Sequence, residues 1–107
     1  NGFLRSGRKV NRVKYLWIDD VRPAPKGWIH LKTVEAAIDF ISKHDDIAVI
    51  SVDHDAGDYG PPDYIEVLKW MEARMYPAPP IRLHSMNVVG KMNMRAIIER
   101  NGWTEVF

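Results

Sequence analysis

The stretch IAVISVD, residues 47–53, decides the fold class of this chain. It is a short, nearly continuous apolar run that ends in a carboxylate, as expected for a central strand buried on both faces of a parallel sheet. Two further segments have the same character, VKYLWID at 13–19 and IRLH at 81–84. Weaker candidates for edge strands are residues 28–31 and 103–107. We therefore predict a parallel sheet with residues 47–53 at its centre.

Three segments between these strands have the apolar spacing of amphipathic helices. The first carries Val34, Ala37, Ile38 and Ile41, with Thr33 as its predicted N-cap. The second runs from about residue 63 to 76, and the third, from about residue 90, ends at the Asn101-Gly102 pair. Strands that alternate with helices indicate βαβ units and an α/β fold.

The first connection is too short for a complete crossover helix. Only residues 20–28 separate the first strand from the candidate edge strand, whereas a crossover with its helix needs about a dozen residues or more. We therefore expect a loop or a single helical turn there, so that the first crossover helix is shortened or missing.

Length and composition limit the organisation of the chain. Its 107 residues have room for one domain, which we place at 13–107. Cysteine is absent, which excludes disulfides and thiolate metal sites and is consistent with a cytoplasmic protein. No apolar run is long enough to span a membrane. Residues 1–12 form a basic leader, which we interpret as flexible or artificial, with attraction to phosphate backbones as the alternative.

Three carboxylates follow two of the predicted strands. Asp19 and Asp20 end the first strand and Asp53 ends the central one, so the parallel sheet brings them to one edge, where open α/β sheets bind ligands. Clustered carboxylates repel one another unless a cation or a basic side chain compensates them. A Mg²⁺ ion held by all three is one solution, and Arg22 is another. The alternative is that the aspartates form turns and caps.

Histidines accompany these carboxylates. His54 lies between Asp53 and Asp55, and His84 follows the strand at 81–84. An imidazole exchanges protons near neutral pH, so His54 and His84 are candidates for a catalytic base and acid, oriented by Asp53 and Asp55. Each histidine has a structural alternative as a hydrogen-bonded group at a strand end. His30 and His44 lack polar neighbours, and we interpret both as structural or surface residues.

The segment SMNVVGKMNM, residues 85–94, leads from a strand end into a helix start. Backbone N–H groups at such a start favour an anion. Side-chain donors to a phosphate would come from Arg22, Ser85, Asn87, Lys91 and Asn93. Simple N-capping by Ser85 or Asn87 is the alternative. Neither a dinucleotide-binding glycine motif nor a P-loop is present.

Four segments together resemble a known family. They are LWIDDVRPAPKGW at 16–28, VDHDAG at 52–57, EVLKWME at 66–72 and HSMNVVGKMNM at 84–94. They are similar to the cyclic-phosphate-processing receiver domain, a divergent branch of the response-regulator receiver superfamily. The resemblance implies a three-layer, receiver-like (flavodoxin-like) parallel sheet. Ala56, Val88 and the Gly60–Asp63 turn depart from the family pattern beside the site, which affects the expected substrate shape more than the chemistry.

The resemblance also implies processing, by hydrolysis, of cyclic phosphodiesters on nucleotides or RNA ends. We expect a cyclic phosphodiesterase-like hydrolase of the cytoplasm that requires no cofactor or uses Mg²⁺, with no membrane or disulfide partner. One alternative is a signalling receiver that accepts a phosphoryl group on Asp53, although no lysine follows the expected fifth strand. A non-catalytic nucleotide- or protein-binding module is the other alternative.

Overall fold

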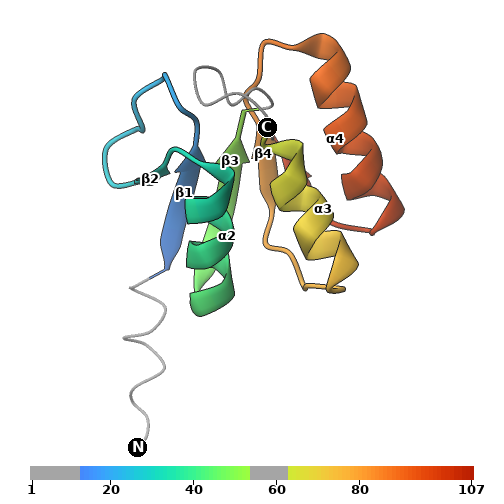
Figure 1. The fold of residues 1–107 in the computed structure, drawn as a ribbon, viewed down its shortest axis with the longest axis horizontal. Coiled ribbons are helices and arrows are strands. Elements are labelled where there is room, and N and C mark those ends of the chain that lie inside the picture. The colour runs from blue at the N-terminus through green and yellow to red at the C-terminus, as the bar shows by residue number, and fades with distance from the viewer. Residues whose placement is uncertain (1–12, 54–62) are drawn as a thin grey trace, which may run out of the picture.

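A computed structural model describes residues 13–53 and 63–107 of the chain (Figure 1). Its centre is a five-stranded sheet in the order β2-β1-β3-β4-β5, in which every neighbouring pair is parallel. The strands are β1 (Lys14–Ile18), β2 (Ile29–Leu31), β3 (Ile47–Val52), β4 (Ile81–Leu83) and β5 (Glu105–Val106). The predicted parallel sheet is therefore confirmed, including both weak edge candidates.

Three helices connect the strands: α2 (Val34–Lys43), α3 (Ile65–Ala73) and α4 (Val88–Arg100). Thr33 caps α2 as predicted, because its hydroxyl accepts a hydrogen bond from the backbone N–H of Ala36 at 3.0 Å. The helix α4 ends before Gly102, whose φ of 69° suits a residue without a Cβ. The second helix is shorter than the predicted 63–76, because Met75 takes a φ of 52° and leads the chain into Pro77.

All three helices share one core with one face of the sheet. Alternate strand residues point to this face and are almost completely buried: Leu16, Ile18, Ile50, Val52, Ile81 and Leu83. Buried residues of α2, α3 and α4 belong to the same cluster. In Figure 1, α2 and α3 lie in front of the strands and α4 beside them. The helices α2, α3 and α4 therefore lie on one side of the described sheet.

The first connection contains no helix, as its length predicted. Residues 19–28 run from β1 to β2 through bends and a turn in which the N–H of Trp28 bonds to the carbonyl of Pro25 at 3.1 Å. Trp28 then packs against Tyr15 and Trp17 of β1, with ring centroids 5.4 and 6.0 Å apart. This loop and its tryptophan cover part of the sheet face opposite the helices.

The predictions for the N-terminal leader and for membrane-spanning helices concern the ends and the helices of the chain. The basic leader of residues 1–12 lies outside the described residues. Within the described residues, no helix has the length and apolarity needed to cross a bilayer.

Candidate functional site

The carboxyl ends of β1 and β3 bring three carboxylates together. Asp19 and Asp20 follow β1, and Asp53 follows β3, which is hydrogen-bonded beside it. One carboxylate oxygen from each of the three lies within 4.8 Å of the others. The backbone N–H of Asp53 bonds to the carbonyl of Ile18 at 3.0 Å, which extends the pairing of the two strands to this edge. The sequence predicted this cluster, and the parallel register produces it.

Asp19 is the buried member of the cluster. Its Oδ1 accepts hydrogen bonds from the backbone N–H groups of Val21, at 2.8 Å, and Arg22, at 3.0 Å. Burial alone raises the pKa of Asp19, but these backbone N–H groups and the side chain of His84 together hold it below its usual value. Asp19 is therefore a carboxylate at neutral pH although it is shielded from solvent.

His84 lies across the sheet from Asp19 and has hydrogen bonds on both ring nitrogens. Its Nε2 is 2.9 Å from Oδ2 of Asp19, and its Nδ1 is 2.8 Å from the hydroxyl of Ser51 on β3. The side chain is only 5% exposed. An ionised carboxylate only accepts, so Nε2 carries the hydrogen, and Nδ1 then accepts from the Ser51 hydroxyl. One neutral tautomer satisfies both contacts.

The charge state of His84 agrees with that tautomer. Burial lowers the pKa of His84, and although Asp19 and Asp53 raise it, the net result is below the ordinary value. The contact between His84 and Asp19 at neutral pH is therefore a hydrogen bond from a neutral ring to a carboxylate. It is not an ion pair.

Trp17 and Arg22 both contact His84 and are hydrogen-bonded to each other. The indole of Trp17 stacks on the His84 ring with centroids 3.9 Å apart and planes 6° from parallel. Its Nε1–H donates to the carbonyl of Arg22 at 3.0 Å, and Arg22 Nη1 donates to the carbonyl of His84 at 2.8 Å. Arg22, predicted as a phosphate ligand, thus reaches the site. One of its five N–H donors is used in the hydrogen bond to the carbonyl of His84.

The start of α4 places the remaining predicted phosphate ligands. The hydroxyl of Ser85 accepts from the N–H of Asn87 at 3.0 Å, and Oδ1 of Asn87 accepts from the N–H of Gly90 at 2.8 Å. Both residues therefore act in the turn and N-cap that precede α4. Lys91 is half-buried on the first turns of this helix. Asn93 lines a groove between α3 and α4 together with Lys69 and Arg100.

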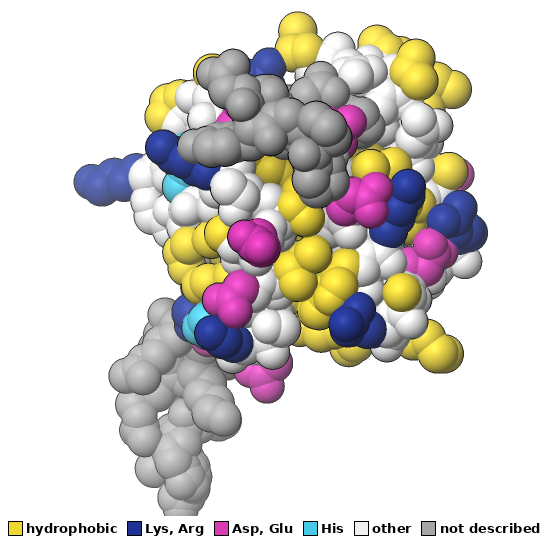
Figure 2. Space-filling view, in the orientation of Figure 1, with side chains coloured by type: hydrophobic (Ala, Val, Ile, Leu, Met, Phe, Trp, Pro, Cys, Tyr) yellow, Lys and Arg dark blue, Asp and Glu magenta, His cyan; other side chains and the backbone are white. Residues whose placement is uncertain are grey.

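An exposed apolar patch adjoins the site. Figure 2 shows yellow side chains along the top edge, above the start of α4. Its members are 61–80% exposed: Met86, Val88, Val89 and Met92. Met86 and Val88 follow His84 and Ser85 directly in the chain. Several exposed apolar side chains close together in the chain mark interaction sites more often than isolated residues do.

The carboxylate cluster fits a hard divalent cation. Carboxylate oxygens are the donors that Mg²⁺ prefers, and Mg²⁺ binds through few carboxylates while keeping several waters. Two members, Asp20 and Asp53, are half-buried and Asp19 is fully buried, so the cluster has one shielded and two accessible members. Asp19, Asp20 and Asp53 are the residues that would hold such an ion.

Sequence reasoning missed two residues of this site, and two residues that it named lie outside the described part of the chain. Ser51 and Trp17 were interpreted as strand residues, although their spacing from Asp53 and Asp19 places them on the same sheet face as those carboxylates. That two-residue spacing was the available signal. His54 and Asp55 lie outside the described residues, so their predicted roles stay predictions.

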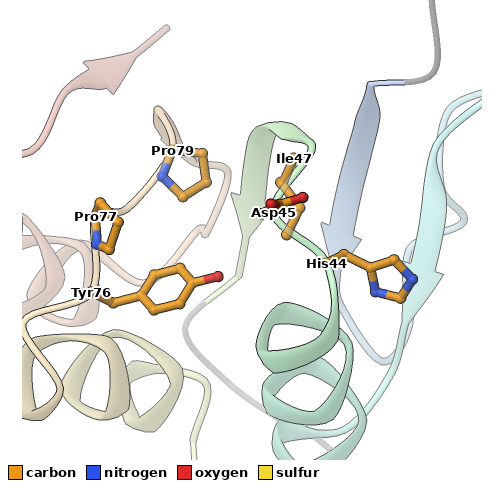
Figure 3. Close-up of a pocket in the computed structure, with 6 residues that line it drawn as sticks. All are labelled: His44, Asp45, Ile47, Tyr76, Pro77 and Pro79. Carbon is orange, nitrogen blue, oxygen red and sulfur yellow. The ribbon is translucent and has the colours of Figure 1, made fainter. Parts of the chain in front are cut away.

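The opposite edge of the sheet has a different character. A shallow pocket there is lined by His44, Asp45, Ile47, Tyr76, Pro77 and Pro79 (Figure 3). The hydroxyl of Tyr76 points toward the end of α2 and donates to the carbonyl of Ile41 at 2.9 Å. This pocket is bounded mainly by apolar rings and has no carboxylate cluster among its lining residues.

Comparison with known proteins identifies a family. The family model of the cyclic-phosphate processing receiver domain matches residues 14–100, which span every described element from β1 to α4. Neither the curated proteins nor the solved structures searched contain a matching relative. The matched range includes the carboxylates, His84 and the start of α4. The chain therefore belongs to the cyclic-phosphate processing receiver domain family.

Proposed function

We propose that the carboxyl edge of the sheet binds a cyclic phosphate on a nucleotide or RNA end and opens it by hydrolysis, with a divalent cation held by Asp19, Asp20 and Asp53. The observation that carries this proposal is the convergence of three carboxylate oxygens within 4.8 Å at the ligand-binding edge of a parallel sheet. Family membership supports this substrate class, and the carboxylate cluster supports this location.

The charges of the site support a phosphate ligand only with a cation present. Three carboxylates repel an anion, and Arg22 is the nearby basic side chain that already contacts the site. A bound divalent ion would neutralise the carboxylates and polarise a phosphoryl oxygen. The remaining N–H donors of Arg22 and backbone N–H groups at the start of α4 would supply hydrogen bonds to the other phosphoryl oxygens.

The apolar patch supports a ligand larger than inorganic phosphate. The side chains of Met86, Val88 and Val89 lie next to the site in the chain and are exposed. Met and Val side chains offer a surface on which the organic part of a nucleotide can rest. His54 follows Asp53 directly, so its proposed task is to activate the attacking water or protonate the departing sugar oxygen.

The test is turnover of an RNA oligonucleotide that ends in a 2′,3′-cyclic phosphate, with EDTA and with added Mg²⁺. We expect ring opening by the wild type, loss in EDTA, recovery with Mg²⁺, and loss in Asp53→Asn. Asp39→Asn, a carboxylate on the surface of α2 paired with Lys43, is the matched control and retains turnover. Activity that survives EDTA but is lost in His54→Ala would replace the cation with a histidine mechanism.

A second candidate is phosphoryl acceptance on Asp53. It is favoured by the position of Asp53 at the end of the central strand, beside Asp19 and Asp20. Incubation with radiolabelled acetyl phosphate separates the two functions. Stable label on the wild type and none on Asp53→Asn, together with no opening of the cyclic phosphate, would establish the receiver function instead.

A further inference from the structure

We propose that His84 is a positioning residue that orients the carboxylate of Asp19, and that Ser51 holds the His84 ring in place for this contact from its other nitrogen. This assignment differs from the prediction that His84 exchanges a proton with the substrate. Its turnover test rests on the proposed hydrolysis and its cation titration on the proposed cation site, whereas its tautomer test rests on neither.

The hydrogen bonds of the His84 ring are compatible with only one position of its hydrogen when the ring is neutral. Asp19 is ionised, so its Oδ2 accepts and His84 Nε2 carries the hydrogen across the 2.9 Å contact. The other nitrogen, Nδ1, then accepts the hydrogen of the Ser51 hydroxyl at 2.8 Å. Ser51 is fully buried, so no solvent competes for this hydroxyl. Asp19 thus sets the Nε2–H tautomer, and Ser51 holds the ring from its other nitrogen.

This arrangement leaves no ring nitrogen for a substrate. A general acid or base must lie within hydrogen-bond reach of the proton that it transfers. Both nitrogens of His84 are occupied by protein groups, and Trp17 covers one ring face at a centroid distance of 3.9 Å. With its side chain 5% exposed, His84 contacts Asp19 rather than the open edge of the site.

The arrangement instead restrains Asp19. The backbone N–H groups of Val21 and Arg22 hold Oδ1, and His84 holds Oδ2. A carboxylate restrained at both oxygens cannot rotate, so its remaining lone pairs keep a fixed direction. Groups that orient a metal ligand in this way typically change metal affinity by about 10–100-fold when they are removed.

The first test reads the tautomer directly. Long-range ¹H–¹⁵N spectra of the metal-free protein should show His84 with a protonated Nε2 and an unprotonated Nδ1. Ser51→Ala should keep Nε2 protonated, because Asp19 still accepts its hydrogen, and should shift the Nδ1 resonance, which loses its hydrogen-bond donor. Ser51→Thr should restore the Nδ1 shift, and Ser42→Ala should change nothing. Ser42 is the matched control because its hydroxyl bonds to the carbonyl of Asp39 on exposed α2. A protonated Nδ1 in the wild type would overturn the proposal.

The second test reads the restraint on Asp19. Binding of Mn²⁺ and of Mg²⁺ is titrated calorimetrically in the same variants, with folding checked by thermal unfolding. We expect Ser51→Ala to weaken binding about tenfold, and Ser51→Thr to return it to the wild-type value. Equal affinities in Ser51→Ala and wild type would show that the hydrogen bond does not position Asp19. If Ser51→Thr does not fold, His84→Gln supplies the same comparison against His84→Ala.

The third test separates positioning from proton transfer. The side-chain amide N–H of glutamine can replace the Nε2–H of His84 toward Asp19, but an amide does not titrate near neutral pH. If His84 positions Asp19, His84→Gln keeps cyclic-phosphate opening within about tenfold of wild type, whereas His84→Ala loses it. Equal loss in both variants with cation affinity retained in His84→Gln would show proton transfer. No turnover by the wild type would defeat the proposed function and leave the first two tests to decide this inference.

Discussion

Two histidines of this protein have the same local packing and different surroundings. His84, at the carboxyl edge of the sheet, stacks on Trp17, and His44, at the opposite edge, stacks on Phe40, each with ring centroids 3.9 Å apart. Nδ1 of His44 is 2.9 Å from the carbonyl of Phe40, one turn earlier in α2, so this nitrogen carries a hydrogen. The two rings therefore have opposite protonated nitrogens in their described contacts.

The difference shows that stacking at a strand or helix end does not determine which groups a histidine contacts. His44 hydrogen-bonds within its own helix end and fixes only the local chain. His84 joins a carboxylate on β1 to a hydroxyl on β3, residues that lie 65 and 33 positions away in the sequence. What distinguishes it is the partner, a buried carboxylate that belongs to a cluster of three.

The largest effect should follow from Asp19→Asn. An asparagine oxygen can still accept from Val21 and Arg22, but its NH₂ group then faces the Nε2–H of His84. We expect the His84 hydrogen to move to Nδ1, with the Ser51 hydroxyl accepting, and cation affinity to fall by more than about tenfold. Imidazole ¹⁵N spectra and calorimetric titration measure the two effects. An unchanged His84 tautomer would contradict the hydrogen-bond assignment, and Asp39→Asn is the control.

The next largest effect is on the free energy of unfolding, in which we expect the two histidines to differ. His84→Ala removes a buried hydrogen bond to a carboxylate and the ring that covers Trp17, and we expect a loss of about 2–4 kcal/mol in the free energy of unfolding. His44→Ala removes one hydrogen bond to a carbonyl at a helix end, with an expected loss of about 1 kcal/mol. Urea denaturation measures both. Equal losses would mean that the Asp19 contact adds nothing to the packing of the ring.

A smaller effect is the pH dependence that His84 gives to stability. Its folded-state pKa is lowered, so as pH falls through 6.5 the unfolded chain takes up a proton that the folded protein refuses. The free energy of unfolding should therefore decrease between pH 6.5 and the lower pKa of the folded state. Asp19, whose pKa is also lowered, contributes stability that is lost only at acid pH below 3.8.

Two variants test whether His84 causes this pH dependence of the free energy of unfolding. His84→Gln removes the titrating ring and should flatten the dependence in the window below pH 6.5. His44→Gln leaves the His84–Asp19 contact intact and should keep the slope. Denaturant unfolding at a series of pH values measures both, and a wild-type slope retained in His84→Gln would assign the effect to another group.

The sheet was predictable from the sequence because a short run of apolar residues followed by a polar residue indicates where a strand ends. Apolar runs that stop at a carboxylate fixed the ends of β1 and β3, and the parallel order followed from the helices between them. The absent first helix followed from the count of residues 20–28. The early end of α3 was less predictable, because it depends on the positive φ of Met75 before Pro77.

The site was predictable only as a set of residue types at one edge. Asp19, Asp20 and Asp53 converge because neighbouring parallel strands end together. Which atom faces which depends on the register of β1 and β3 and on the strand-face alternation that brings Ser51 under His84. No local pattern records that register, so sequence reasoning left out Ser51 and Trp17.

The smallest effect is expected at the other end of the same two strands. Lys14 at the start of β1 pairs with Asp46 just before β3 at 2.6 Å, with side chains 28% and 33% exposed. The hydrogen bond from Lys14 holds the pKa of Asp46 below its usual value, so the pair adds stability above pH 3.8 that is lost as pH falls through the lower folded-state pKa. Because a partly exposed pair is screened by salt, Asp46→Asn should destabilise less than either histidine variant, and 1 M salt should reduce the difference from wild type. Cation affinity at the opposite edge should stay at the wild-type value; a fall in affinity would show that register at one end of β1 and β3 controls the carboxylates at the other.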